Sequence, residues 1–428
     1  SVLRMVGVRP RVSIKALGGR PAKLVMPSAN YCDPKFPRKR FGERNPAMEF
    51  AFTEEQVMIF DTADAFLSEV ATAPVIRQSL LTVSGYDTNT WRRLCEEMYW
   101  QAILIPEAHE GLGLGGVEAI GILERMGMRL YNGPFASTAL VTAALLKYGS
   151  DQQQATYFER LMVGETATLG VIEQSRTWSA DAVTAVATPT EGGFHLSGHY
   201  RFVGHGNSTD ILLLAARIED ELALFLVEGT ADGMARQKSP TMDQTRPLAE
   251  VTLDGVFVPQ GCELARGLAA VDALTAIIDV LRIFTAAEQL GGAQASLDMS
   301  VDYVKERVQF GRTIASFQAI KHKCADMMLK VEASRSIVYF AACAIDEWLA
   351  GRYTDTQLAE AASMAKAYCS DAFFFVAGSG IQLFGGVGIT EEYDIQLYFK
   401  RAKATESFLG AAPEHKERVA DLLLTGVC

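Results

Sequence analysis

The sequence has few of the features that mark metal-binding, disulfide-rich or membrane-spanning proteins. Its seven cysteines are scattered, with no CxxC pair and no Cys/His cluster at zinc spacing. No uninterrupted apolar run approaches the roughly 18 residues that suggest a transmembrane helix. Cationic residues are outnumbered by acidic ones, and the net charge of -11 argues against nucleic acid or an anionic membrane as partner. An odd set of scattered cysteines fits a reducing compartment, so we expect a cytoplasmic protein.

The first 47 residues differ from the rest of the chain. They hold eleven Lys and Arg but only two acids, Asp33 and Glu43. One interpretation is a transit peptide, which would place the protein in the mitochondrial matrix. The favoured interpretation is an upstream extension ahead of a start at Met48. Proline and glycine are frequent there, so we expect residues 1–48 to hold little stable structure.

The rest of the chain predicts three domains. Residues 49–165 show helical periodicity after a capping-box pattern, Thr53 followed by Gln56. Residues 166–262 contain short apolar or alternating runs separated by turn residues, which is typical of an all-β module. Residues 263–428 return to long patterns of period 3.6 that suit a helical bundle. The expected strands are 167–172, 194–197, 211–216, 222–227 and 251–257, and the expected long helices are 268–305, 317–349 and 355–378.

Three segments carry a resemblance to a known family. The pattern YxxxRxxFGxxxxxxQ begins at Tyr303 and ends at Gln318, and QLFGGVGI occupies residues 382–389. A third segment, DGVFVP, occupies residues 254–259 and would end the β module. In order and spacing these segments resemble the acyl-CoA dehydrogenase family over residues 49–428. The resemblance implies an α+β fold with an N-terminal helical domain, a middle β-barrel-like domain and a C-terminal four-helix bundle.

The resemblance implies FAD as cofactor. A guanidinium can fork onto pyrophosphate oxygens, which suits Arg307, and glycine allows close backbone approach to a nucleotide. In the family each flavin lies across a subunit interface of a tetramer, and the partner holds the adenosine diphosphate end. The residues expected to serve a neighbour's FAD are Arg307, Phe310, Gln318, Gln382, Phe384, Gly385 and Gly386.

The catalytic base is missing from its usual places. The family removes the α-proton of an acyl-CoA with a carboxylate while the flavin takes the β-hydride. The resemblance places the usual Glu at Leu409, and the alternative Glu at Leu281, just before Arg282. Glu406 lies three residues before Leu409, so on a helix it would share that face and is the candidate for a relocated base. Asp279 lies roughly 200° round the helix from Leu281 and should point elsewhere.

The site for this chain's own flavin ring is also altered. In the segment matching the family's TEPxxGSD, Ile172 replaces the Thr and Gln174 the Pro. In the segment matching KxWITNG, Phe202 can still lie against the ring, but Gly204 has lost the Thr hydroxyl. His205 brings a titratable group to this segment, and we expect it to be a surface-loop histidine.

Residues that would serve a partner's flavin are therefore kept, while those for this chain's own ring and base are changed. This favours a subunit of an α2β2 heterotetramer, known in this family among bacterial dehydrogenases that shorten steroid side chains. With a base-bearing relative it would form an α,β-unsaturated acyl-CoA and pass electrons to an acceptor flavoprotein. The alternatives are a homotetramer with a relocated base such as Glu406, and a non-catalytic acyl-CoA-binding or scaffold protein. No feature selects another flavin reaction, such as oxygenation.

Overall fold

The computed structural model describes residues 51–171 and 177–424. The extension expected at residues 1–48 lies outside the described residues, as do the two changes at Ile172 and Gln174. By its internal contacts the chain divides into two units, with the boundary after Ala51. All elements described below belong to the unit that begins at Phe52.

Helices form the first part of this unit, as predicted. The capping box at Thr53 is confirmed: its hydroxyl accepts from the Gln56 amide at 3.1 Å, and the Gln56 side chain accepts from the Thr53 amide at 3.0 Å. Helix α3 ends at Arg93, and a π-turn leads on to Tyr99, which has φ 57°. The helices are α1 (Glu54–Val70), α2 (Ala73–Ser79), α3 (Thr88–Arg93), α4 (Gly116–Met128), α5 (Phe135–Tyr148) and α6 (Asp151–Met162).

Strands β1 to β8 form one sheet in the order β6-β7-β3-β2-β4-β5-β8, with β1 parallel to β4. Strands β4 and β5 are neighbours in this sheet and are nearly continuous apolar runs. Both are buried on both faces, as such runs favour. The sheet also encloses an apolar core between its own strands, separate from the main core. The strands are β1 (Ala167–Gly170), β2 (Val186–Thr190), β3 (Gly193–Gly204), β4 (Ile211–Ile218), β5 (Glu221–Glu228), β6 (Met234–Lys238), β7 (Leu248–Pro259) and β8 (Glu263–Arg266).

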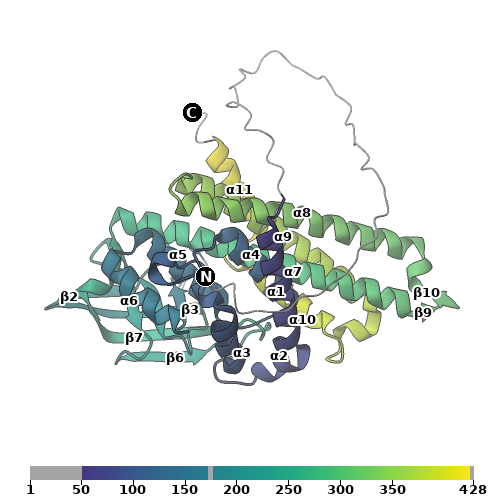
Figure 1. Cartoon of the computed structure of the whole chain (residues 1–428), viewed down its shortest axis with the longest axis horizontal. Helices are drawn as coiled ribbons and strands as arrows, with labels where there is room; N and C mark the ends of the chain where they lie inside the picture. Colours follow the sequence, from purple (N-terminus) through teal and green to yellow (C-terminus); the bar gives the residue numbers. More distant parts are fainter. Residues whose placement is uncertain (1–50, 172–176, 425–428) are drawn as a thin grey trace, which may run out of the picture. The chain divides into compact units, whose positions relative to one another are not determined.

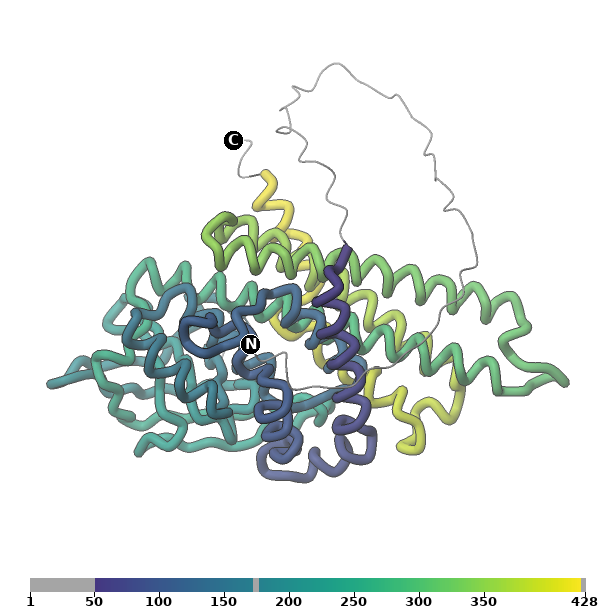
Figure 2. Tube along the Cα trace, viewed as in Figure 1, coloured from purple at the N-terminus to yellow at the C-terminus, as the bar shows by residue number. Residues whose placement is uncertain are grey.

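The C-terminal bundle is built on three long helices, and α9 is central because it contacts α7, α8, α10 and α11 (Figure 2). By length and composition α9 could cross a membrane, but half of its most apolar stretch is buried, as in a core helix. A small hairpin, β9 (Val308–Gln309) and β10 (Arg312–Thr313), joins α7 to α8. The helices are α7 (Leu268–Glu306), α8 (Gln318–Leu349), α9 (Asp355–Phe384), α10 (Ile395–Ser407) and α11 (Ala412–Leu424).

One continuous apolar core joins the three parts. It includes residues of α1 and α4, one face of β4 and β5, and the inner faces of α7, α8 and α9. The helix–sheet–helix order predicted from the sequence is therefore confirmed, while the boundaries drawn at residues 165 and 262 stay predictions. In Figure 1 the sheet lies at the left and the β9–β10 hairpin at the right end of the long helices.

Candidate functional site

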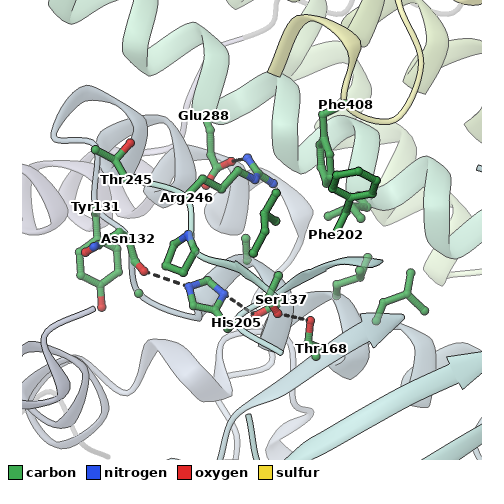
Figure 3. A pocket seen from close by; sticks show the side chains of 18 of the residues that line it. Tyr131, Asn132, Ser137, Thr168, Phe202, His205, Thr245, Arg246, Glu288 and Phe408 are labelled. Atoms are coloured by element: carbon green, nitrogen blue, oxygen red, sulfur yellow. Dashed lines mark hydrogen bonds and ion pairs between the residues drawn. The ribbon is translucent and has the colours of Figure 1, made fainter. Parts of the chain in front are cut away.

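A pocket of about 50 Å³ lies where α7 and the end of α10 meet the sheet (Figure 3). Its walls come from the α4–α5 connection, from β1 and β3, from the loop between β6 and β7, and from α7 and α10. Sites for drug-sized ligands are usually about 300–1,000 Å³. The volume that the described residues leave here is below that range.

Aromatic side chains fill much of this region. Phe408, just after α10, packs against Trp178 with ring centroids 5.1 Å apart. The guanidinium of Arg246 lies 4.6 Å from the centre of the Phe408 ring. Phe202, which the family resemblance would place beside a flavin ring, also lines the pocket and is partly exposed. Phe408, Trp178 and Phe202 therefore give the pocket part of its aromatic lining.

The pocket contains an ion pair that the sequence interpretation missed. Arg246 donates to the Glu288 carboxylate at 2.5 Å, and both side chains are mostly buried. Among the described residues that line the pocket, Glu288 alone carries a carboxylate. It lies seven residues after Leu281 on α7, which is two helical turns along the same face. The signal that could have indicated it is an acid at helical spacing from Leu281, seven residues further along the chain.

The expectation that His205 is a surface-loop residue is wrong. Its ring is buried, Nε2 donates to the Asn132 carbonyl at 2.9 Å, and Nδ1 lies 3.5 Å from the Ser137 hydroxyl. Burial lowers the pKa of His205 to about 4, so the ring is neutral at neutral pH. The tight turn after β3 puts the side chain inward, with φ 56° at this residue. His205 thus serves as a buried link between the sheet and the α4–α5 connection.

Neither position to which the resemblance assigns the family's base carries an acid. Leu281 lines the pocket, and Leu409 is fully buried directly after Phe408. The idea that Glu406 and Leu409 share a helix face is wrong, because α10 ends at Ser407 and Leu409 has φ 65°. The Glu406 carboxylate accepts from Lys403 at 2.7 Å, and Glu406 is not among the lining residues.

Asp279 is directed away from the pocket, as predicted. Its buried carboxylate accepts from Arg282 at 2.7 Å and from the two terminal nitrogens of Arg418 at 2.5 and 2.8 Å. Arg282 also donates through Nε to the Leu409 carbonyl at 3.2 Å. Asp279 therefore holds two guanidinium groups behind the loop that contains Leu409.

The residues expected to hold FAD phosphates lie at the other end of the bundle. Tyr303 stacks on Phe384 at 4.1 Å and donates to its carbonyl at 3.3 Å, which brings the two sequence motifs together. Phe310 is 91% exposed, and Gly385 has φ +65° with nothing within 4 Å of an added Cβ. The exposed residues of this surface, called the hairpin end below, are Arg307, Phe310, Gln318, Gln382, Gly385 and Gly386.

The two ends of the bundle therefore differ in their fit to FAD. The hairpin end offers an exposed guanidinium, exposed amides and open glycine backbone, which suit a pyrophosphate approaching from outside. The pocket beside Phe202 is small and occupied by aromatic side chains. None of the hairpin-end residues lines this pocket.

Comparison with known proteins matches both helical parts of the chain. Residues 53–165 match the acyl-CoA dehydrogenase N-terminal domain, and residues 270–424 match the acyl-CoA dehydrogenase C-terminal domain. The acyl-CoA dehydrogenase IpdE2 of Mycolicibacterium smegmatis is 32% identical over 367 residues, 86% of this chain and 98% of that protein.

Solved structures agree with this match. The Tcur3481-Tcur3483 steroid ACAD, solved as a variant, has a TM-score of 0.77 at 29% identity, covering 87% of this chain and 99% of that one. The ChsE4-ChsE5 complex of Mycobacterium tuberculosis has a TM-score of 0.78 at 25% identity, covering 88% and 99%. The chain belongs to the acyl-CoA dehydrogenase family. Members of this family are FAD flavoproteins, oxidoreductases that act on CH–CH bonds.

Proposed function

We propose that this chain is the subunit without a catalytic base in an α2β2 acyl-CoA dehydrogenase. Its hairpin end would hold the adenosine diphosphate part of the FAD whose ring lies on a base-bearing partner. The complex would convert an acyl-CoA to its α,β-unsaturated product and pass the electrons to an acceptor flavoprotein. We expect it in the cytoplasm, consistent with the bacterial sources of the similar dehydrogenases.

The observation that carries the proposal is that, among the described residues that line the pocket, the one carboxylate is held in an ion pair. Glu288 is bound to Arg246, so its carboxylate is engaged by a guanidinium within this chain. Leu281 contributes only an apolar side chain to the pocket wall. Proton abstraction at the α-carbon would then fall to another chain.

The exposure of the hairpin end supports the proposal that it holds the adenosine diphosphate part of a partner's FAD. Arg307 is exposed at the end of α7, where its guanidinium can reach a ligand held by a neighbouring chain. FAD supplies the hydride acceptor when bound. This chain would contribute the guanidinium fork of Arg307, the amide of Gln382 and close backbone approach at Gly385 and Gly386.

Similar proteins support both the heteromer and the substrate class. The ChsE4-ChsE5 structure is a complex of two named chains, and the Tcur3481-Tcur3483 protein is named a steroid enzyme. We therefore propose a bulky, steroid-derived acyl-CoA as the substrate of the complex.

The test is flavin stoichiometry, measured as released FAD per chain from its absorbance. The chain purified alone should hold little FAD, and co-purification with a base-bearing homologue should give about one FAD for every two chains. About one FAD per chain from the lone protein would refute the proposal and return attention to a homotetramer. Acyl-CoA binding without flavin, alone and with every homologue tried, would indicate a scaffold protein instead.

A further inference from the structure

Lys366 is fully buried in the middle of α9, although lysine is rarely buried without a charged partner. Within the described residues its ammonium donates to neutral oxygens rather than to a carboxylate. The closest is the Ser370 hydroxyl at 2.7 Å, one turn further along α9. The cost of burying this charge must therefore be offset by the other groups that it contacts.

These other groups are backbone carbonyls at the end of α10. Lys366 Nζ donates to the carbonyls of Thr405 at 3.0 Å, Gly410 at 3.3 Å and Glu406 at 3.4 Å. The last carbonyls of a helix lack partners within the helix and carry the negative end of its dipole. Lys366 thus caps α10 from inside the bundle, together with Gln289, whose amide donates to Thr405 at 3.1 Å.

The segment that follows the cap is the one that enters the pocket. Phe408 lies against Trp178 and Arg246, and Leu409 follows at φ 65°, a conformation that costs a leucine free energy. Such a conformation persists only when its surroundings hold it. Here the holding contacts are Arg282 to the Leu409 carbonyl and Lys366 to the carbonyls on either side.

We propose that Lys366 is a positioning residue for the pocket, and that its ammonium holds the segment from Thr405 to Gly410 so that Phe408 lies against Trp178. Loss of the proton would weaken this hold and let Phe408 move. The proposal concerns this chain's own pocket and holds whichever subunit supplies the base.

The charges around Lys366 place its titration near neutral pH. Burial lowers the pKa of Lys366 to about 7. The charges of two nearby guanidiniums lower the pKa of Lys366 further, whereas a nearby thiol and a nearby carboxylate raise it. His415 on α11 also faces this group, but burial lowers the pKa of His415 to about 3, so it stays neutral above pH 5. On α8 the neighbouring group is the Ser334 hydroxyl, which hydrogen-bonds Cys369. The groups that act on Lys366 are Cys369 on α9, Arg282 on α7, Arg246 before β7 and Glu406 on α10.

Protonation changes the number of contacts that Lys366 can make. An ammonium has three N–H donors and a full charge to set against the carbonyl dipoles, whereas the neutral amine has two donors and no charge. With four oxygens around Nζ, deprotonation removes a donor and weakens the remaining bonds. The segment with Phe408 should therefore be tighter below neutral pH than above it.

Trp178 offers a direct readout, because its ring touches Phe408. We would record tryptophan fluorescence of the full chain across about pH 5.5–8.5, and repeat it with Trp178→Phe to isolate the Trp178 signal. The expected result is a Trp178-dependent transition with its midpoint near pH 7. Lys366→Met should show the high-pH signal at every pH, because methionine has no charge. Lys366→Arg should show the low-pH signal at every pH, because arginine keeps its charge.

Lys403→Met is the matched control, because Lys403 lies on the same helix end but is exposed and binds the Glu406 side chain. It should keep the Trp178-dependent transition, with at most a small shift of the midpoint through Glu406, which acts on Lys366. The proposal is overturned if the wild-type chain shows no Trp178-dependent transition, or if Lys366→Met shows the same one. Thermal unfolding checks that both Lys366 variants are folded. If neither is, the absence of a Trp178-dependent transition in the wild-type chain still overturns the proposal.

Discussion

Truncation of Arg307 should lower the affinity of the assembled enzyme for FAD without destabilising this chain. The backbone of Arg307 is fixed independently of its side chain: its amide donates to Tyr303 at 2.9 Å, and its carbonyl accepts from Ile314 at 2.8 Å. The side chain itself is exposed. Arg307→Ala should therefore leave the thermal unfolding midpoint of the chain nearly unchanged, since exposed substitutions usually matter little.

The expected loss follows from the bonds that a guanidinium makes to a phosphate. Charge-assisted hydrogen bonds contribute about 1.5–3 kcal/mol. That range corresponds to a rise in the dissociation constant of FAD of about 10- to 150-fold. Arg307→Lys keeps the charge but not the fork, so its loss should be smaller than that of Arg307→Ala.

The assay is FAD titration of the flavin-stripped complex with a base-bearing homologue, followed by flavin fluorescence. Arg312→Ala is the matched control, because Arg312 lies in the same hairpin but stacks on Phe317 at 4.1 Å. Unchanged FAD affinity in Arg307→Ala would refute the assignment of the hairpin end. Equal losses in both variants would show that only the positive charge of the surface matters.

Other predictions concern stability and the base. Gly385→Ala should cost about 1–3 kcal/mol and loosen FAD, because φ +65° strains any other residue; thermal unfolding and FAD titration measure the two effects. Asp279→Ala should destabilise by about 3–5 kcal/mol in urea unfolding, because it leaves two guanidiniums without their shared carboxylate. The lowered pKa of Lys366 means that the unfolded chain binds the proton more tightly than the folded chain. The free energy of unfolding should therefore rise from about pH 7 towards pH 10, by at most about 1.4 kcal/mol per pH unit. Lys366→Met should flatten that slope. Glu406→Gln should leave turnover by the complex unchanged; a hundredfold loss would favour the homotetramer.

The sequence predicts long and strongly patterned elements well. The helix expected over residues 268–305 is α7, which ends at Glu306, and the expected strands 211–216 and 222–227 are β4 and β5. Strands β2, β6 and β8 were not predicted. In β2 and β6 most side chains are exposed or half-buried, so their residues show little of the apolar alternation that marks a strand.

The site was harder to predict because it is assembled from residues far apart in the chain. Arg246 and Glu288 are separated by 42 positions and meet only when the β6–β7 loop packs on α7. The burial of His205 likewise depends on the α4–α5 connection, which no local pattern reveals. Glu406 was misjudged because α10 ends one residue after it, and helix ends are the least predictable part of an element.

The contact between Arg401 and Asp243 has a consequence for the way the chain unfolds. Both side chains are almost completely buried, at 2.7 Å, and Arg401 also donates to the Thr245 carbonyl at 2.6 Å. Separating α10 from the sheet would leave two opposite charges without partners in an apolar setting, at a cost of several kcal/mol. The shared apolar core adds to this penalty. We therefore expect one cooperative melting transition for the described residues, and a fragment cut out at the predicted domain boundaries should not fold by itself.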